Sequence, residues 1–370
     1  MRRVLAAALA ILPLLTGCGN ATSIDTRALV VGIAVDKGQK AGELRYTFQV
    51  PSPQALGGGG GGSGSGGNKF YYPTAEAPSL ASAISLVEDR TSRDIYLGQL
   101  KIVLLALDLP PAQRDEFLRE EQRLGEVDHT EWFAFTKPSA ATVLSPPPNQ
   151  EQLPSLYYSV HFNCRACQST SMGVEAWKLD RDQMEPGHSA SLPIIDITDG
   201  QYSIATLGTY NPGQAPVVFN VSESAYIMLA LGEMHKGVIE PTTPLGLAVV
   251  RSLGARTNRR GRVDSQGRVH LTLKVKMGGT IAEAPHQADR ITPEISQMVS
   301  QATSDVIRTG LEEVVRKAQV HGVDPFRFGQ AMYRQNPAAV SRLGSWPQAF
   351  SKAVVEVSVQ VGTLRQGITV

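Results

Sequence analysis

The last third of the 370-residue chain combines one long amphipathic helix with a strictly alternating strand, and this pairing constrains the fold most. From Ile295 onward the apolar residues recur at helical spacing; Thr292 is a candidate cap followed by proline, and Gly322 ends the stretch. Residues 353–362 alternate apolar and polar side chains, as in a strand with one buried face. A helix near residues 293–320 that packs on a sheet predicts an α+β fold.

Basic residues precede a second alternating region in this part of the chain. The stretches 263–270 and 271–276 predict two strands. The cations directly before them are Arg256, Arg259, Arg260 and Arg262. We interpret these arginines as a basic turn. A solvated hairpin loop is the simpler interpretation, and the alternative is contact with anionic lipid head groups or with an acidic face of a partner.

The first third of the chain predicts a mixed unit of strands and helices. The apolar stretch 29–35 and the alternating stretch 44–50 predict a hairpin. Residues 57–67 contain only Gly and Ser, so they cannot bury apolar surface and form a flexible loop. The other elements expected here are a helix at 77–90, a strand at 96–105, a helix at 112–124 and a strand at 132–135.

Composition shifts along the chain predict three mixed domains with mainly antiparallel sheets and packed helices. The proline run 146–148 marks the first boundary, because it can neither pair in a sheet nor continue a helix. We expect an N-terminal α+β domain at 18–150, a middle domain at 151–244 and a C-terminal α+β domain at 245–370, which contains the long helix. The middle region is the least regular; a short strand at 194–197 and a short helix at 225–231 are its clearest elements.

The N-terminus has the pattern of a bacterial lipoprotein signal peptide. Arg2 and Arg3 precede the apolar stretch 4–15, which is too short to span a bilayer as a helix. Small residues then lead directly to Cys18, as in a lipobox. We expect residues 1–17 to be removed and Cys18 to carry a covalent lipid that anchors the protein to the outer face of the cell membrane.

The overall composition is that of a folded chain with no strong charge bias. Hydrophobic residues make up 42% and charged residues 19%, and the formal net charge is +1. A balance so close to neutral argues against nucleic acid as a partner, which usually requires a strong basic excess.

The remaining two cysteines, Cys164 and Cys167, form a CxxC pair. A local disulfide or two inert thiols is the simplest interpretation. Thiol exchange would require a thioredoxin-like strand before the pair, which the sequence does not indicate. Zinc would require four ligands, and the spacing to His161 and His188 matches no common pattern. We therefore predict no metal site.

Four blocks, taken in this order, resemble the Ger(x)C family, the lipoprotein C subunits of GerA-type nutrient germinant receptors of bacterial spores. The blocks are DTRALVVGIAVDKG at 25–38, YLGQLKIV at 96–103, Gln319 with DPFRFG at 324–329, and WPQAF at 346–350 before the last strand. The resemblance implies a three-domain α+β lipoprotein at the outer face of the spore inner membrane. It also implies integral membrane A and B subunits as partners and no catalytic residues.

The sequence contains no motif typical of hydrolase, protease or nucleotide chemistry. The acidic residues of the second predicted helix and its surroundings are interpreted as a solvated face: Glu120, Glu121, Glu126, Asp128 and Glu131. We therefore expect a non-enzymatic receptor subunit with no cofactor other than the lipid. The alternatives are a lipid-anchored solute-binding protein and a tethered thiol oxidoreductase.

Overall fold

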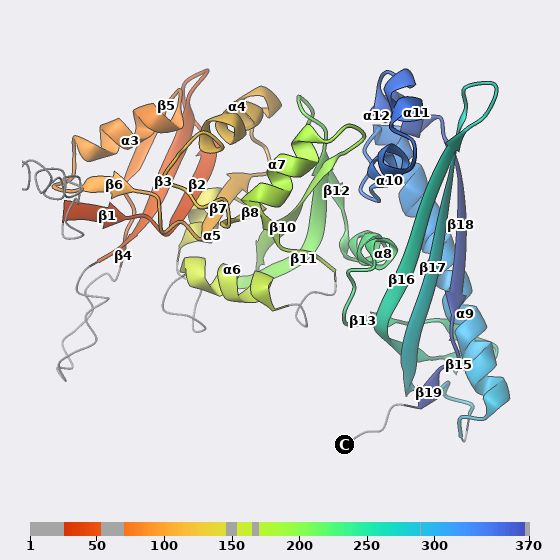
Figure 1. Ribbon diagram of the computed structural model, residues 1–370. Helices are drawn as coiled ribbons and strands as arrows, with labels where there is room; N and C mark the ends of the chain where they lie inside the picture. Colours follow the sequence, from red (N-terminus) through yellow and green to blue (C-terminus); the bar gives the residue numbers. More distant parts are fainter. Residues whose placement is uncertain (1–25, 53–69, 146–153, 165–169, 289, 367–370) are drawn as a thin grey trace, which may run out of the picture.

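The computed structural model describes residues 26–52, 70–145, 154–164, 170–288 and 290–366. Within these ranges the chain forms two large sheets, which lie at opposite ends of the molecule in Figure 1. The fold is mixed, with helices packed on both sheets and mostly antiparallel strand pairs, as the sequence predicts. Cys18 and the Gly/Ser loop 57–67 lie outside the described residues.

The N-terminal sheet has ten strands in the described residues, in the order β12-β11-β10-β8-β7-β2-β3-β4, with β5 beside β3 and β9 beside β8. Its strands are β2 (Gly32–Lys37), β3 (Leu44–Pro51), β4 (Phe70–Tyr71), β5 (Thr74–Ala77), β7 (Ile102–Ala106), β8 (Trp132–Lys137), β9 (Val174–Glu175), β10 (Ala190–Thr198), β11 (Gln201–Tyr210) and β12 (Val217–Phe219). The four central strands β10, β8, β7 and β2 are parallel, and the outer pairs are antiparallel.

Helices cover both faces of this sheet (Figure 1). They are α3 (Leu80–Glu88), α4 (Pro111–Glu121), α5 (Ala140–Leu144), α6 (Pro154–Asn163) and α7 (Ala176–Met184). The ring of Phe117 in α4 packs against Tyr46 of β3, whereas Gln49 of β3 donates to the Leu144 carbonyl of α5 on the opposite face. Because both faces are covered, the central strands are continuous apolar runs, and all five residues of β7 are buried.

The predicted strand at 96–105 is divided in the structure. Residues Asp94–Tyr96 form β6, which pairs in parallel with β1 (Arg27–Leu29), and β7 begins only at Ile102. The Leu100 amide donates to the Leu97 carbonyl, so a tight turn separates the two strands. The predicted hairpin of β2 and β3 is confirmed.

The C-terminal sheet has five strands in the described residues, in the order β13-β16-β17-β18 with β19 beside β17. Its strands are β13 (Gly237–Ile239), β16 (Val249–Val263), β17 (Val269–Glu283), β18 (Val354–Val361) and β19 (Arg365–Gln366). A small pair, β14 (Thr242–Thr243) and β15 (Gly246–Leu247), precedes β16. β16 and β17 form one long hairpin, and β18 joins β17 in parallel.

The predicted long helix is confirmed as α9 (Pro293–His321), which runs behind the C-terminal sheet in Figure 1. The Thr292 side chain caps it, and Gly322 ends it in the left-handed conformation. Gly310 packs against a helix rather than the sheet: Tyr226 of α8 (Val221–Leu231) occupies the space where a Cβ would lie. The remaining helices are α10 (Phe328–Gln335), α11 (Pro337–Arg342) and α12 (Trp346–Ser351).

Much of the region assigned to a middle domain, 151–244, shares the N-terminal sheet, whereas its strand β13 belongs to the C-terminal sheet. Its strand β10 pairs in parallel with β8, with Ile194 opposite Phe135. A polar chain links this region to the C-terminal part, because Asp324 donates its amide to Ser189 Oγ and Ser189 donates to Asn211. The three domain boundaries stay predictions. In the part of the chain that the structure describes, no helix is long and apolar enough to cross a bilayer.

Candidate functional site

The predicted CxxC pair is only partly described. Cys164 follows α6 directly and is disulfide-bonded, and its amide donates to the carbonyls of Val160 and His161. Cys167 lies outside the described residues, so the pairing of the two cysteines stays a prediction. His188, the second histidine considered for zinc, lies beside Asp182 and Glu185 in the loop after α7.

The predicted basic turn is wrong. All four arginines lie within β16, and the turn of the hairpin is formed by residues 264–268, where Asp264 accepts the amides of Gln266 and Arg268. The strand was missed because Arg259 and Gly261 stand on its inner side at this end, so the apolar alternation that marks a half-buried strand is absent.

Alternation along β16 divides the arginines between the two faces of the sheet. The exposed members are Arg256, Arg260 and Arg262, while the side chain of Arg259 turns inward and donates to the Phe326 carbonyl at 3.0 Å. Burial lowers the pKa of Arg259. Arg259 therefore stabilises the fold through its contact with the Phe326 carbonyl, and only the other three arginines remain exposed for a partner or lipid.

Strand register places further cations beside the exposed arginines. Arg256 lies opposite Lys276, and Asn258 lies opposite Lys274. We name the exposed set of Arg256, Arg260, Arg262, Lys274 and Lys276 the basic face. All of its members except Arg262 line a shallow hollow of about 650 Å³, whose only acidic lining residue among the described residues is Glu356 of β18.

The ion pairs of this hairpin, within the described residues, gather at its turn. Asp264 binds Arg268 at 3.0 Å and His270 at 2.9 Å, and these contacts hold the pKa of Asp264 well below its usual range. No carboxylate of the described chain forms an ion pair with the basic face. The face therefore presents uncompensated positive charge on a flat sheet surface, which is the electrostatic complement of an acidic or anionic partner.

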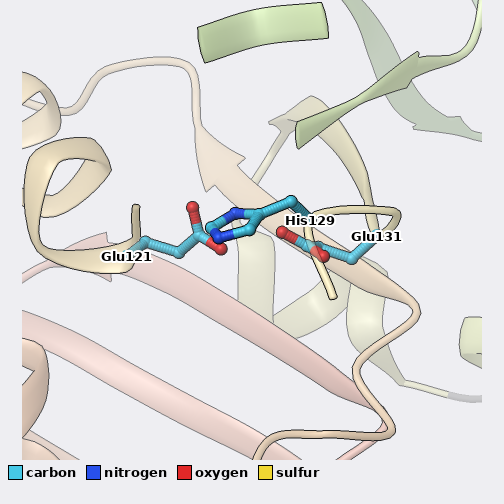
Figure 2. Close-up of side chains that lie close together, drawn as sticks. All are labelled: Glu121, His129 and Glu131. Carbon is cyan, nitrogen blue, oxygen red and sulfur yellow. The ribbon is translucent and has the colours of Figure 1, made fainter. Parts of the chain in front are cut away.

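A second group of polar residues was misinterpreted from the sequence. Glu121, His129 and Glu131 converge at the edge of the N-terminal sheet (Figure 2). Glu121 ends α4, Glu131 directly precedes β8, and His129 lies in the loop between them at a φ of 55°. Both glutamates are buried at 1% exposure, so the expected solvated face is wrong for them.

Backbone contacts to α7 hold the loop that carries this group. The amide of Ala176 donates to the Glu131 carbonyl at 2.9 Å, and the amide of Trp177 donates to the His129 carbonyl at 3.1 Å. Burial, together with the neighbouring Glu131, raises the pKa of Glu121 well above its usual range. One sequence signal could have located Glu121 in the interior: it stands four residues after the buried Phe117, on the same face of α4.

The chain is similar to known proteins over nearly its whole length. The family model "Spore germination protein N-terminal domain" matches residues 20–197, and "Spore germination B3/GerAC like, C-terminal" matches residues 218–367. The putative spore germination protein YfkR of Bacillus subtilis (strain 168) is 22% identical over 369 residues, covering 96% of this chain and 94% of that protein. The crystal structure of the GerBC protein matches with a TM-score of 0.56 at 16% identity, covering 89% of this chain and 96% of that one. That likeness shows a shared fold.

Proposed function

The chain belongs to the Ger(x)C family of spore germination proteins, and we propose that it is a lipid-anchored, non-enzymatic subunit of a germinant receptor. Its partners would be the integral membrane A and B subunits, and its place the outer face of the spore inner membrane. The observation that carries the proposal is the match of both family models, in order, across residues 20–197 and 218–367. The basic face supplies a surface suited to partner contact.

The lipid on Cys18 would hold the protein at the membrane. Only residues 19–25 separate Cys18 from the first described residue, and an extended chain spans ~3.5 Å per residue, so the fold would stay within a few tens of ångströms of the bilayer. Tethering raises the effective concentration of the subunit beside its membrane partners.

Replacing Cys18 tests this anchor. We expect Cys18→Ala to move the protein from the membrane fraction to the soluble fraction of sporulating cells and to impair nutrient-triggered germination. Ser23→Ala, which alters the same segment without removing the thiol, should leave both unchanged. Retention of the Cys18→Ala protein in washed membranes would rule out the lipid as its anchor.

The basic face would contact an acidic surface of an integral membrane partner. Figure 1 places β1, which follows the predicted tether, at one end of the molecule and the C-terminal sheet at the other. A surface remote from the tether is better suited to a partner protein than to the lipid beneath the anchor. The exposed cations lie on adjacent strands of a rigid sheet, so their spacing is fixed before binding.

Charge reversal tests the contact in the full lipidated chain. The variant carries Arg256→Glu, Arg260→Glu and Lys274→Glu, and the control carries Arg316→Glu, Arg342→Glu and Lys352→Glu, which are exposed outside the face. We expect the first set to reduce co-purification with the A and B subunits at least tenfold, with a weaker salt dependence, and the control to bind normally.

The same variants distinguish a partner protein from lipid. Unlipidated protein is added to vesicles with and without anionic lipid. Reduced vesicle binding with normal co-purification would assign the basic face to lipid head groups. Unchanged behaviour in both assays would exclude the face as a contact surface.

A further inference from the structure

The carboxylates of Glu121 and Glu131 and the imidazole of His129 point toward one another from three separate positions in the chain (Figure 2). One candidate ligand atom from each residue lies within 4.8 Å of the other two. Glu121 is the last residue of helix α4, and Glu131 directly precedes the central strand β8, so regular structure fixes the backbone of Glu121 and closely constrains that of Glu131.

Polar atoms of this cluster lack a hydrogen-bond partner elsewhere in the described residues. Both carboxylate oxygens of Glu131, Oε1 of Glu121 and Nδ1 of His129 are buried and have no hydrogen-bond partner outside the cluster; within it, a proton on Glu121 can be donated to Glu131. Buried polar groups without a partner are costly, and two carboxylates at this separation repel each other when both are ionised. A cation between them would satisfy the unpaired oxygens and remove the repulsion.

From this geometry we infer that Glu121, His129 and Glu131 bind a divalent transition-metal ion of the zinc type. Carboxylate oxygen and imidazole nitrogen are both good zinc ligands, whereas calcium and magnesium prefer oxygen alone. Tetrahedral ligands at ~2.1 Å from zinc lie ~3.4 Å apart, so the three side chains need to close by up to about 1.4 Å. Solvent would supply the fourth ligand, because the His129 side chain is 36% exposed.

Asp180 of α7 stands where an outer carboxylate would orient the histidine. Its Oδ2 lies 4.0 Å from His129 Nδ1, and Gln122 fixes the same carboxylate through a 2.6 Å hydrogen bond to Oδ1. Metal-binding histidines commonly donate their second ring nitrogen to a carboxylate, and a shift of about 1 Å would bring His129 Nδ1 within hydrogen-bond distance of Asp180. The bound ion would therefore connect the end of α4, the loop before β8 and, through Asp180, helix α7. Its role is structural, because it ties three elements at one edge of the sheet.

Titration of the chelator-treated full-length mature chain with zinc chloride tests the site. Calorimetry should give one saturable site per chain, with a rise of several degrees in Tm, because an ion that binds only the folded state stabilises it. Calcium and magnesium chloride should give neither effect. His129→Gln should weaken zinc binding at least tenfold without loss of folding, since this side chain is partly exposed.

Two further variants make the result decisive. Glu131→Gln should abolish the zinc-induced rise in Tm, while the metal-free protein keeps or gains stability because a buried carboxylate is replaced by a neutral amide. His188→Gln changes another histidine that lies beside two carboxylates, so it should leave zinc binding intact. Absence of stoichiometric binding to the unmodified chain would overturn the inference in favour of a proton shared by Glu121 and Glu131. Equal binding by His129→Gln would overturn it as well.

Discussion

At the scale of single residues, Asp324 shows how the DPFRFG block is built. Its carboxylate is 1% exposed and accepts three hydrogen bonds, from the Phe326 amide at 3.1 Å, the Gly329 amide at 2.9 Å and Trp346 Nε1 at 3.1 Å. The block and the later WPQAF block are therefore joined through one side chain. Burial raises the pKa of Asp324 to about 6, although the three donors oppose this shift.

The raised pKa of Asp324 predicts a pH dependence with a definite sign. The folded state keeps this proton up to about pH 6, whereas the unfolded chain releases it near pH 4. The contribution of Asp324 to the free energy of unfolding is therefore greatest below about pH 4. It decreases as the pH rises to about 6 and stays at its lowest value above that pH. The total change is on the order of 2–3 kcal/mol.

Denaturant unfolding from about pH 4 to about pH 7.5 checks this for the unmodified chain and Asp324→Asn. The difference in free energy of unfolding, unmodified minus variant, should decrease over the lower part of this range and then level above the raised pKa. Asp305→Asn removes an exposed carboxylate and should not reproduce this decrease. If the free energy of unfolding of the unmodified chain, minus that of the variant, instead increased with pH, the three hydrogen bonds would keep Asp324 ionised in the folded state.

Aromatic residues were easier to predict from the sequence than buried charged ones. Phe326, Phe328, Trp346 and Phe350 belong to residue types that are usually buried, and all four are buried. Arginine, in contrast, is a residue type that is usually exposed. Arg114 is nevertheless 0% exposed, pairs with Asp115 at 2.7 Å and lies over the ring of Tyr210. Glu121 and Glu131 were also missed, because charged residue types are usually exposed and the packing that buries these two is not visible in the local sequence.

At the scale of elements, the strength of the hydrophobic pattern decided which predictions succeeded. Helix α9 and strand β18 each bury one continuous face, so their periodicities of about 3.6 and about 2 are plain in the sequence. The outer half of β16 has polar residues on both faces and was mistaken for a turn. Helix α4 buries Arg114, Asp115 and Glu121 beside Phe117 and Leu118, so its inner face did not differ from its outer one in polarity.

Helix α10 contacts the loop after α7 so closely that only glycine fits. A Cβ on Gly329 would lie 2.7 Å from the carbonyl carbon of Gly187 and 2.6 Å from Trp346 Cε2, and the carbonyl oxygen of Gly187 would be closer still. The backbone of Gly187 has a φ of 83° and is held by its own turn, so it cannot give way as a flexible side chain could.

We therefore expect Gly329→Ala to lower the free energy of unfolding by about 2 kcal/mol, as overpacking does, despite the better helix propensity of alanine. Gly278→Ala is the matched control, because a Cβ there meets no atom within 4 Å. It should change stability by less than ~0.5 kcal/mol. Equal effects of the two substitutions in denaturant titrations would contradict the close approach of α10 to the loop.

At the scale of the whole molecule, the sequence indicated the fold class and the C-terminal architecture but not the extent of the first sheet. The proline run 146–148 suggested a boundary, since prolines interrupt local structure. The chain nevertheless returns to the same sheet beyond it, where β10 adds to β8. Parallel pairing between strands nearly 60 residues apart leaves no local pattern for a sequence to show.

This topology predicts where the chain can be cut. A fragment of residues 24–151, which ends beside the expected domain boundary at 150, would leave β8 as an open edge and expose Phe135, whose ring packs against Tyr210 of β11. Open apolar edges favour aggregation, so this fragment should bind hydrophobic dyes and unfold without a cooperative transition. A fragment of residues 24–220 keeps β9–β12 and should unfold cooperatively in guanidinium, as followed by circular dichroism.

The two fragments together decide between a shared sheet and independent domains. Truncation after residue 220 removes the hydrogen bond between Ser189 and Asp324, and it also removes helix α8, whose Ser224 Oγ accepts the Leu207 amide of β11. The longer fragment thus loses contacts on the outer strands, whereas the shorter one loses β10 and β11 themselves, so the longer fragment should be destabilised less. If residues 24–151 alone formed a soluble, cooperative unit, β10 would be an addition to a complete domain, and the boundary at 150 would stand.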